Sequence, residues 1–547
     1  MSRTRDISNI YSSDDFSGAG NLVSIDSNYT AVEDDVIFVN TASTAIAVTL
    51  PASPSSGGKI KVLDVSANSQ NNNITILGNT YNINSASAYV IDTPDSSVDL
   101  VYINSNKGWI VSNEYISIRK PSVPTGVSAV DVGTGRAYND GAATVSFIPA
   151  LDGDLAASYT VVSTPGSYTA TGTSSPIVVP GLQSNTSYTF KVFASNAAGN
   201  STESTASSSI TATTVPEAPT ISTVQYGYEQ ISVNYTQGGT GGKAVSAYTA
   251  TRTGAVSASG TSPISFTSLT GGTQYTVSMT ATNSNGVSLT SNSITQTPFT
   301  ASGGTVSTSG SYRIHTFTGT SNFVLTGNTV SCEYLIIAGG GAGGANYGGG
   351  GGAGGYLTSS VSVSPGTYGI TVGAGASGGG DGTYRIQGSS SSAFGISPVG
   401  GGGGGSANQS SPGGNGGSGG GSGANGGSAG LGTAGQGNNG TTTSGSASGA
   451  SGGGAGAAAT DPGNGGSGAS SSITGTSVVR AGGGGGSGYW RAAGGGGAGG
   501  GGGGGYRGGG PGAGSANTGG GGGGGSETPS AGGGSGIVIV RYLTTLV

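Results

Sequence analysis

The stretch AGGGGGSGYWRAAGGGGAGGGGGGGYRGGGPGAG, Ala481–Gly514, decides how the C-terminal part of this chain is interpreted. Glycine loses more conformational freedom on folding than any other residue, so composition alone favours a flexible linker. Two clusters of aromatic residues and arginine, at residues 489–491 and 506–507, interrupt the glycines. The stretch is therefore either a disordered tether or a folded support that displays these side chains.

Apolar strands around the glycines favour the folded alternative. VSVSPGTYGITVGAG, Val361–Gly375, alternates apolar and polar residues within the glycine tract, as half-buried strands do. SGIVIVRY, residues 535–542, follows the last glycine run. Such a strand would be an aggregation-prone edge unless it paired with another strand. We predict that it pairs with the other apolar run, YLIIAGG, at residues 334–340.

Long glycine runs also have a packing solution of their own. An extended left-handed helix with three residues per turn has no internal hydrogen bonds, so its N–H groups are free to donate to neighbouring helices. Ordering the backbone costs roughly 1–2 kcal/mol per residue, so each helix must bond to several neighbours. Gly499–Gly505 and Gly519–Gly525 are long enough to cross such a bundle. We predict packed polyglycine-type helices closed by β-strands.

Composition limits the possible functions of the chain. Its 547 residues are enough for three to five domains. Charged residues make up only 7% and the net charge is −6, which argues against electrostatic binding of nucleic acid or of a membrane surface. No run of 18 apolar residues is present, so we expect no membrane insertion. A single cysteine excludes an intrachain disulfide.

The rest of the chain is predicted to be all-β. Short runs rich in Val, Ile, Thr and Tyr are separated by turn residues, and helical periodicity is almost absent. Residues 1–20 are polar, and residues 21–118 contain the candidate strands VIFVN, IAVTLP, GKIKVLDV, NITILG, VDLVYI and GWIVSN. In the fifth of these, alternation predicts that Val98, Leu100 and Tyr102 share a buried face.

An internal repeat follows. Leu182, Tyr188, Asn196 and Gly199 recur as Leu269, Tyr275, Asn283 and Gly286, at a constant offset of 87 residues. A period near 90 residues with about seven short strands predicts two tandem β-sandwiches, at residues 119–213 and 214–298.

These repeats resemble fibronectin type III domains. Leu182 to Tyr188 and Leu269 to Tyr275 look like the tyrosine corner of that family, in which the hydroxyl bonds back to the backbone. SNAAGNS and TNSNGVS are similar to the loop before its last strand. Both copies depart from the family at the core tryptophan, where Phe147 and Tyr235 stand instead.

Two further regions resemble parts of bacteriophage fibres. TAVEDDVIFVNTASTAIAVTLPASPSSGGKIKVLDVS, closing on KGWIVSN, is similar to β-modules of phage tail fibres and tailspikes. CEYLIIAGGGAGG, VSVSPGTYGITVGAG, SAFG and GGGSGIVIVRY resemble the glycine-rich domain of many phage tail fibres and adhesins, and place it at residues 299–547. This resemblance implies a homotrimer with a receptor-binding tip, and an N-terminal particle-attachment segment at residues 1–20 that binds baseplate or tail proteins.

Aromatic residues followed by arginine recur within the glycine tract. They are Tyr384, Arg385, Tyr489, Trp490, Arg491, Tyr506 and Arg507. Tyr, Trp and Arg dominate binding hot spots because they offer large rigid area and directional hydrogen bonds, so these residues are candidates for receptor contact. The alternative is that they fill gaps at helix ends, with each arginine bonded to backbone carbonyls.

Catalysis and metal binding have little support in the sequence. Asp152 and Asp154 resemble half of a calcium loop, but no glutamate closes it. His315 is the one histidine, and Cys332 begins an apolar strand as a small buried residue. The glycine tract offers only Asp381, Asp461 and Glu527 as acids. We predict a protein that is not an enzyme and has no metal or cofactor.

Together these features predict a structural protein of a virion, a tail fibre that adsorbs to a bacterial surface glycan or outer-membrane protein. The first residues lack the apolar core of a signal peptide, so we expect synthesis in a host cytoplasm and release within a particle. A capsid or neck fibre that binds host glycans, a polysaccharide-degrading tailspike and a bacterial surface adhesin remain as alternatives.

Overall fold

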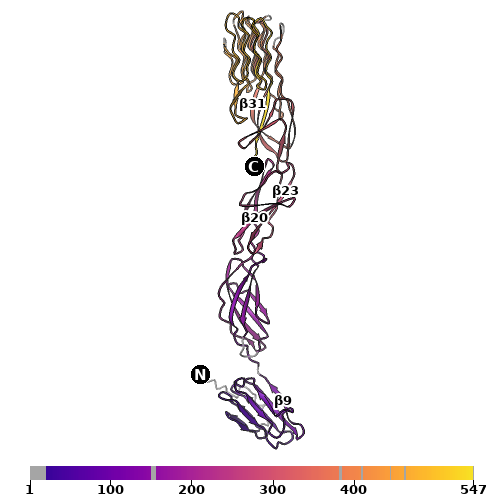
Figure 1. Ribbon diagram of the computed structural model, residues 1–547, viewed down its shortest axis with the longest axis vertical. Coiled ribbons are helices and arrows are strands. Elements are labelled where there is room, and N and C mark those ends of the chain that lie inside the picture. The colour runs from indigo at the N-terminus through magenta and orange to yellow at the C-terminus, as the bar shows by residue number, and fades with distance from the viewer. Residues whose placement is uncertain are drawn as a thin grey trace. The chain divides into compact units, whose positions relative to one another are not determined.

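The computed structural model describes residues 20–116, 118–149, 155–380, 385–407, 411–443, 445–460 and 463–545 (Figure 1). Regular secondary structure in these ranges is β-strand, as the sequence predicts, and no helix among them is long and apolar enough to span a membrane. Contacts divide the chain into two compact units, one that ends at Thr213 and one that begins at Thr214 and includes Thr134–Tyr138.

The first module is a coil of parallel strands that alternate between two sheets. Successive strands are added first to one sheet and then to the other for three turns, and antiparallel strands complete both sheets. One sheet has the order β1 (Leu22–Ile25), β3 (Val36–Val39), β5 (Lys59–Asp64), β8 (Ser97–Asn104) and β9 (Gly108–Tyr115); the other has β2 (Tyr29–Thr30), β4 (Ile46–Thr49), β6 (Ile74–Leu77) and β7 (Ala88–Ile91).

The core of this module follows the alternation read from the sequence. Val98, Leu100 and Tyr102 on β8 are buried, which confirms the predicted face. Trp109 on β9 is fully buried, and its ring centroid lies 5.5 Å from that of Tyr102. All six predicted strands form. The parallel coil itself was not predicted.

Two similar sandwiches follow the first module. Each pairs a three-stranded sheet with a second sheet built around one long strand. The first sandwich consists of β10 (Thr125–Val132), β11 (Gly141–Ile148) and β14 (Ile177–Leu182), with β13 (Thr169–Gly172), β12 (Ser158–Thr164), β15 (Thr186–Asn196), β16 (Gly199–Asn200) and β17 (Ile210–Ala212). The second consists of β18 (Thr220–Gly227), β19 (Gln230–Thr236) and β22 (Ile264–Phe266), with β21 (Val256–Ser259), β20 (Val245–Arg252), β23 (Tyr275–Asn283), β24 (Gly286–Val287) and β25 (Ile294–Gln296).

Both predicted tyrosine corners are present. Gln183 N donates to Tyr188 Oη at 3.0 Å, and Thr270 N donates to Tyr275 Oη at 3.2 Å. Both rings are buried in their sandwich cores. The equivalent hydrogen bonds in two copies confirm that the 87-residue offset is a structural repeat.

A serine ladder continues the pairing between β16 and β17 in the first sandwich and between β24 and β25 in the second. Ser204 N donates to Val192 O, and Ser204 Oγ accepts from Val192 N; Ser207 repeats both bonds with Phe190. In the second sandwich Ser288 does the same with Ala281. Here a hydroxyl stands in for the backbone carbonyl that a regular strand would present.

The C-terminal region begins with two further sheets. They enclose an apolar core that includes Phe299, Phe323 and Cys332. One sheet has the order β26 (Thr300–Ser302), β29 (Ser321–Thr326) and β32 (Gly366–Ile370); the other has β27 (Thr305–Ser309), β28 (Tyr312–Phe317), β35 (Ile537–Leu543), β30 (Val330–Ile337) and β31 (Tyr356–Val363). β35 pairs with β30 along its length, as predicted, and β28 covers its other edge.

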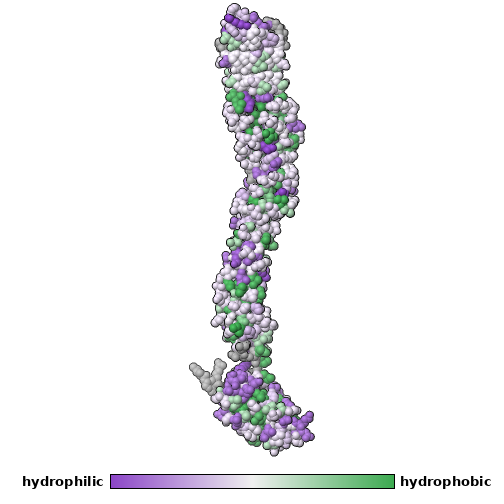
Figure 2. Space-filling model, in the orientation of Figure 1, coloured by the Kyte–Doolittle hydropathy of each residue, from purple (hydrophilic) through white to green (hydrophobic). Residues whose placement is uncertain are grey.

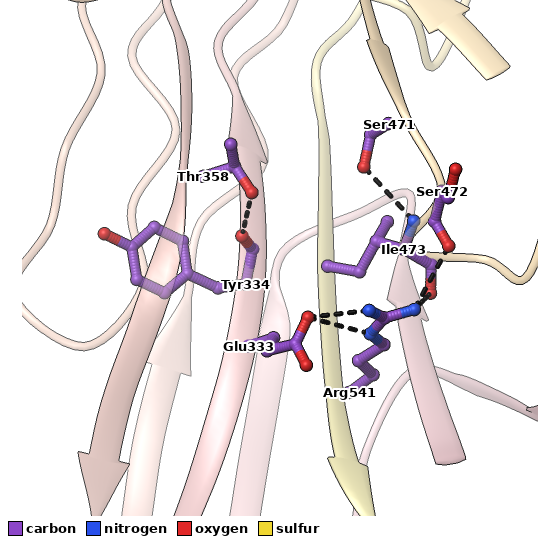
Figure 3. Close-up of polar contacts among 7 residues, drawn as sticks. All are labelled: Glu333, Tyr334, Thr358, Ser471, Ser472, Ile473 and Arg541. Carbon is purple, nitrogen blue, oxygen red and sulfur yellow. Dashed lines mark hydrogen bonds and ion pairs between the residues drawn. The ribbon is translucent and has the colours of Figure 1, made fainter. Parts of the chain in front are cut away.

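Arg541 fixes the closing strand β35 to its surroundings (Figure 3). Its Nη2 lies 2.7 Å from Glu333 Oε2 on β30, and its Nη1 donates to the carbonyls of Ser472 and Ile473. These two residues lie in the turn between β33 (Ala469–Ser471) and β34 (Val478–Arg480). The guanidinium therefore joins strands from distant parts of the chain through its several donors.

Glycine runs lie side by side beyond these sheets, at the top of Figure 1. The central run, Gly348–Gly355, bonds to six neighbouring runs through its backbone, and every third residue returns to the same neighbour. Its N–H groups donate to the runs 519–525, 399–405 and 450–453, and its carbonyls accept from the runs 338–344, 418–421 and 482–488.

Side chains are excluded from most positions of these runs. A Cβ added to Gly351 would lie 2.2 Å from Gly341 O, and one added to Gly352 would lie 2.1 Å from Ser418 O. Real Cβ atoms do not approach backbone oxygens so closely. Ala353, in the same run, instead directs its methyl group into an apolar cluster with Leu335 and Ile337 of β30. The glycine content is thus a packing requirement.

Candidate functional site

The chain reverses direction at both ends of the glycine runs. The run 338–344 leaves β30 and ends in residues 345–347, and the antiparallel run 348–355 returns to β31. Residues 526–530 lie at the same level, because Gly525 N donates to Gly344 O. We call the connections at this end, away from the sheets, the tip: residues 345–347, 385, 489–493, 506–511 and 526–530. Hydrophilic residues gather at this end in Figure 2.

Aromatic rings from two connections meet at the tip. Tyr489 contacts Trp490 edge-on, with ring centroids 4.9 Å apart, and contacts Tyr347 edge-on at 5.7 Å. Tyr489 and Tyr347 are half-buried, whereas 77% of the Trp490 surface is exposed. Tyr489 thus supports an indole that remains open to solvent.

A third connection adds Tyr506 and Arg507. Arg507 N donates to Gly488 O, and its Nε donates to Tyr489 O at 3.1 Å. Its guanidinium carbon lies 5.1 Å from the centre of the Tyr506 ring, which is 44% exposed. The structure therefore brings Tyr489, Trp490, Tyr506 and Arg507 together from two connections.

Tyr347 and Glu527 belong to the same cluster, although the aromatic-then-arginine pattern missed them. Tyr347 Oη donates to Glu527 Oε1 at 2.6 Å. This hydrogen bond, together with partial desolvation, raises the pKa of Tyr347 to about 12. Tyr347 is not followed by arginine, and Glu527 stands among small polar residues, so neither had a local signal.

The remaining predicted site residues are Arg491 and Arg385, which lie at the tip, and Tyr384. Arg491 Nη2 contacts Thr443 Oγ1 and Gly449 O, each at 3.4 Å, beside a recess of about 10 Å³ that has room for about one water. Arg385 Nε donates to Pro412 O. Tyr384 lies outside the described residues. Each described arginine bonds a backbone carbonyl, as the packing alternative predicts, so these bonds alone do not assign a binding role.

The part of the chain that contains the tip matches a known protein family. Residues 315–543 match a family described as "Glycine-rich domain". The C-terminal region is a glycine-rich domain. Its tip therefore belongs to a module that other proteins share.

The two sandwiches are fibronectin-like β domains, with the same strand order in each and a tyrosine corner in both. A crystal structure of chicken CNTN1 FN1–FN3 domains matches 46% of this chain and 92% of its own length, at 14% identity and a TM-score of 0.22. No curated protein matches the chain.

Several tip residues of the glycine-rich domain have backbone angles that favour glycine. The φ angles of Tyr347, Arg385, Arg507 and Glu527 are 49°, 56°, 45° and 59°. A left-handed conformation costs a residue with a Cβ about 1–2 kcal/mol, and such strain clusters at functional sites. Bulky and charged residues thus occupy turns of this domain where glycine would fit with less strain.

The remaining polar residues of the glycine-rich domain have structural surroundings. Burial lowers the pKa of His315, which lies between Gly303 O and Tyr542 Oη. Cys332 is buried, as predicted, and burial raises the pKa of its thiol to about 12. Asp152, Asp154, Asp381 and Asp461 lie outside the described residues. Among the residues that are described, no three potential ligands gather to hold a metal ion.

Proposed function

We propose that this protein is a non-enzymatic structural component of a bacteriophage virion, a tail fibre that adsorbs to the host surface by non-covalent receptor binding. One observation carries the proposal: exposed aromatic and arginine side chains share one end of a cross-linked glycine array. Tyr, Trp and Arg dominate binding hot spots, and Trp490 presents most of its surface to solvent.

The array of hydrogen-bonded glycine runs supports this function because it would hold the tip connections in fixed positions. Hydrogen bonds that return to the same neighbour at every third residue fit packed polyglycine-type helices, which have three residues per turn. We infer that the runs are such helices. A binding surface fixed in advance loses less conformational entropy when it binds than a mobile loop does. The tip connections gain this advantage because both ends of each are anchored in the array.

The rest of the chain would carry the tip to the host. We propose that residues 1–20 attach the protein to tail or baseplate proteins, and that residues 21–118 help it to oligomerise. The two sandwiches would act as spacers. By resemblance to phage fibres we propose a homotrimer, in which three tips gain avidity without tight single sites. The protein would be made in the host cytoplasm and located in the virion tail fibre.

Competition with phage adsorption tests the proposal. Full-length protein is added to host cells before the phage, and residual adsorption is measured. We expect wild-type protein to block adsorption and Trp490→Ala to block it at least tenfold less well, because a hot-spot residue is worth about 2 kcal/mol or more. Leu289→Ala is the control, since Leu289 is 78% exposed in the second sandwich.

Three results would contradict the proposal. One is equal competition by wild-type and Trp490→Ala proteins that have the same far-ultraviolet circular dichroism. Another is release of oligosaccharides from host capsule by the purified protein, which would indicate a depolymerase. Immunogold labelling on the capsid or neck, instead of the tail, would favour the alternative fibre location.

A further inference from the structure

The described residues of the tip differ in charge from the chain as a whole. The chain has a net charge of −6. The described tip connections instead contain Arg385, Arg491 and Arg507 against one acid, Glu527. Glu527 accepts the hydrogen bond from Tyr347 through Oε1, so one oxygen of the Glu527 carboxylate already has a partner. A locally basic surface on an acidic protein favours an anionic ligand at that surface.

Arg507 has the geometry to bind such a ligand. Its guanidinium has one described hydrogen bond, from Nε to Tyr489 O, which fixes its direction. The two Nη groups keep their N–H donors, and the residue is exposed. A guanidinium binds a carboxylate or phosphate through parallel N–H groups, so an oriented and exposed one suits an oxyanion.

One exposed aromatic residue contacts this guanidinium, and a second follows directly in the chain after the residue whose carbonyl accepts from it. Tyr506 lies under Arg507, and Trp490 packs at right angles to Tyr489, whose carbonyl accepts from Arg507 Nε. Flat aromatic faces stack on the C–H face of a pyranose ring. A sugar ring that stacks on Tyr506 would lie next to the guanidinium of Arg507, which contacts Tyr506. The recess beside Arg491 has a volume of only about 10 Å³, so it does not admit a saccharide.

The backbone of Arg507 supplies an independent observation. Its φ of 45° lies in the left-handed region, although glycine occupies the next three positions and most of the surrounding runs. Folding alone would favour glycine at this position. An arginine held there against its conformational preference suggests a function for the side chain.

We propose that Trp490, Tyr506 and Arg507 form a subsite for an anionic saccharide, a surface glycan whose sugar bears a carboxylate or a phosphate. The inference rests on the proposed function and narrows the receptor to one chemical class. Trp490 and Tyr506 contact the sugar, and Arg507 pairs with its oxyanion.

Affinity electrophoresis of the full-length protein tests this subsite. Three gels contain polygalacturonate as a carboxylate polymer, a phosphomannan as a phosphate polymer, and dextran as a neutral one. We expect retardation by at least one of the anionic polymers and none by dextran. Trp490→Ala and Arg507→Gly should each weaken retardation at least tenfold. Arg507→Lys keeps the charge but not the planar fork, so it should weaken binding less than Arg507→Gly.

Lys107→Ala is the matched control. It removes one positive charge from an exposed side chain in the turn between β8 and β9 of the first module, outside the tip. We expect it to bind within twofold of wild type. In Arg507→Gly the relief of backbone strain should offset the lost hydrogen bond to Tyr489 O. The thermal unfolding midpoint of this variant should therefore equal that of wild type.

The outcomes separate this inference from the proposed function. Failure to bind either anionic polymer, equal retardation by dextran, or unchanged binding by Arg507→Gly would overturn the saccharide subsite. If phage competition nevertheless depends on Trp490, the adsorption function stands and the receptor has another chemistry. Loss of binding after protease treatment of host cells would identify that receptor as a protein. Loss of Trp490 dependence in both assays would overturn both proposals.

Discussion

Tyr347 Oη donates to Glu527 Oε1 at 2.6 Å and so joins two residues that lie 180 positions apart in the sequence. One follows the first glycine run of the domain, and the other precedes the last. Because the ring of Tyr347 also meets that of Tyr489, one phenol connects three tip connections. The tip is therefore a single structure and not a set of independent loops.

The ionisation of Tyr347 gives a direct test of this contact. The hydrogen bond to Glu527 raises the pKa of Tyr347 to about 12, from an ordinary value of 10.0. A phenol with a raised pKa stabilises the folded state fully below the ordinary pKa, and this contribution is lost as the pH rises from about 10 to about 12. The difference in tyrosinate absorbance between wild type and Tyr347→Phe should therefore titrate near pH 12. A midpoint near 10 would mean that the contact does not form in solution.

Glycine substitutions test whether the runs are packed or loose. Alanine at Gly351 would place Cβ 2.2 Å from Gly341 O, so backbone must shift and the glycine-rich domain should lose about 1–3 kcal/mol or more. Alanine at Gly503 meets its nearest atom at 3.9 Å. Gly503→Ala should therefore be neutral or stabilise by about 0.4–1 kcal/mol, since it restricts the unfolded chain.

Calorimetry of the full-length protein measures this difference. The transition of the glycine-rich domain should move to lower temperature in Gly351→Ala and stay in place in Gly503→Ala. Amide exchange in residues 338–355 should rise only in the first variant. Equal behaviour of the two variants, or rapid exchange throughout the runs of wild type, would indicate a flexible tether.

The sequence identified the elements whose signals are local. Alternation predicted the buried face of Val98, Leu100 and Tyr102, and a constant offset predicted equivalent tyrosine corners at Tyr188 and Tyr275. The need to cover an apolar edge predicted that β35 pairs with β30. Each of these inferences used the residue types of single strands or turns, or the comparison of two such segments.

Other features depend on partners that no local pattern reveals. Alternation gives the face of a strand but not its neighbour, so the parallel coil of β1 to β6 was missed. The prediction of aromatic–arginine clusters found the tip residues 489–491 and 506–507, but it could not show that Tyr347 and Glu527 join them. Their proximity is set by which glycine runs lie side by side, and runs of nearly identical sequence carry no information about their order.

The two tyrosine corners should contribute independently to stability. Tyr188→Phe removes the acceptor of Gln183 N, and Tyr275→Phe removes that of Thr270 N. Gln183 and Thr270 are exposed, so water can replace the lost acceptor and each loss should cost about 0.5–1.5 kcal/mol. Tyr188 is the more buried ring and makes the shorter bond, so its loss should be the larger. Amide exchange should rise in residues 158–196 for the first variant and in residues 245–283 for the second.

His315 should make the glycine-rich domain sensitive to acid. Its Nδ1 lies 2.7 Å from Gly303 O, an acceptor, so Nδ1 carries the proton and Nε2 accepts from Tyr542 Oη at 3.0 Å. Burial raises the pKa of Tyr542, which keeps that phenol protonated. The imidazole is thus neutral in the folded state, and a second proton on Nε2 would remove the acceptor of the Tyr542 hydroxyl.

The sign of the pH dependence follows from the lowered pKa of His315. Burial opposes its protonation in the folded chain, whereas the unfolded chain takes up a proton near the ordinary value of 6.5. Stability is therefore complete above that value and falls as the pH drops below it. Because this is the one histidine of the chain, His315→Gln should be less stable at pH 7 but should lose less further stability between about pH 7 and 5. Urea denaturation across this interval measures both effects, and parallel pH profiles for the two proteins would exclude a buried neutral imidazole.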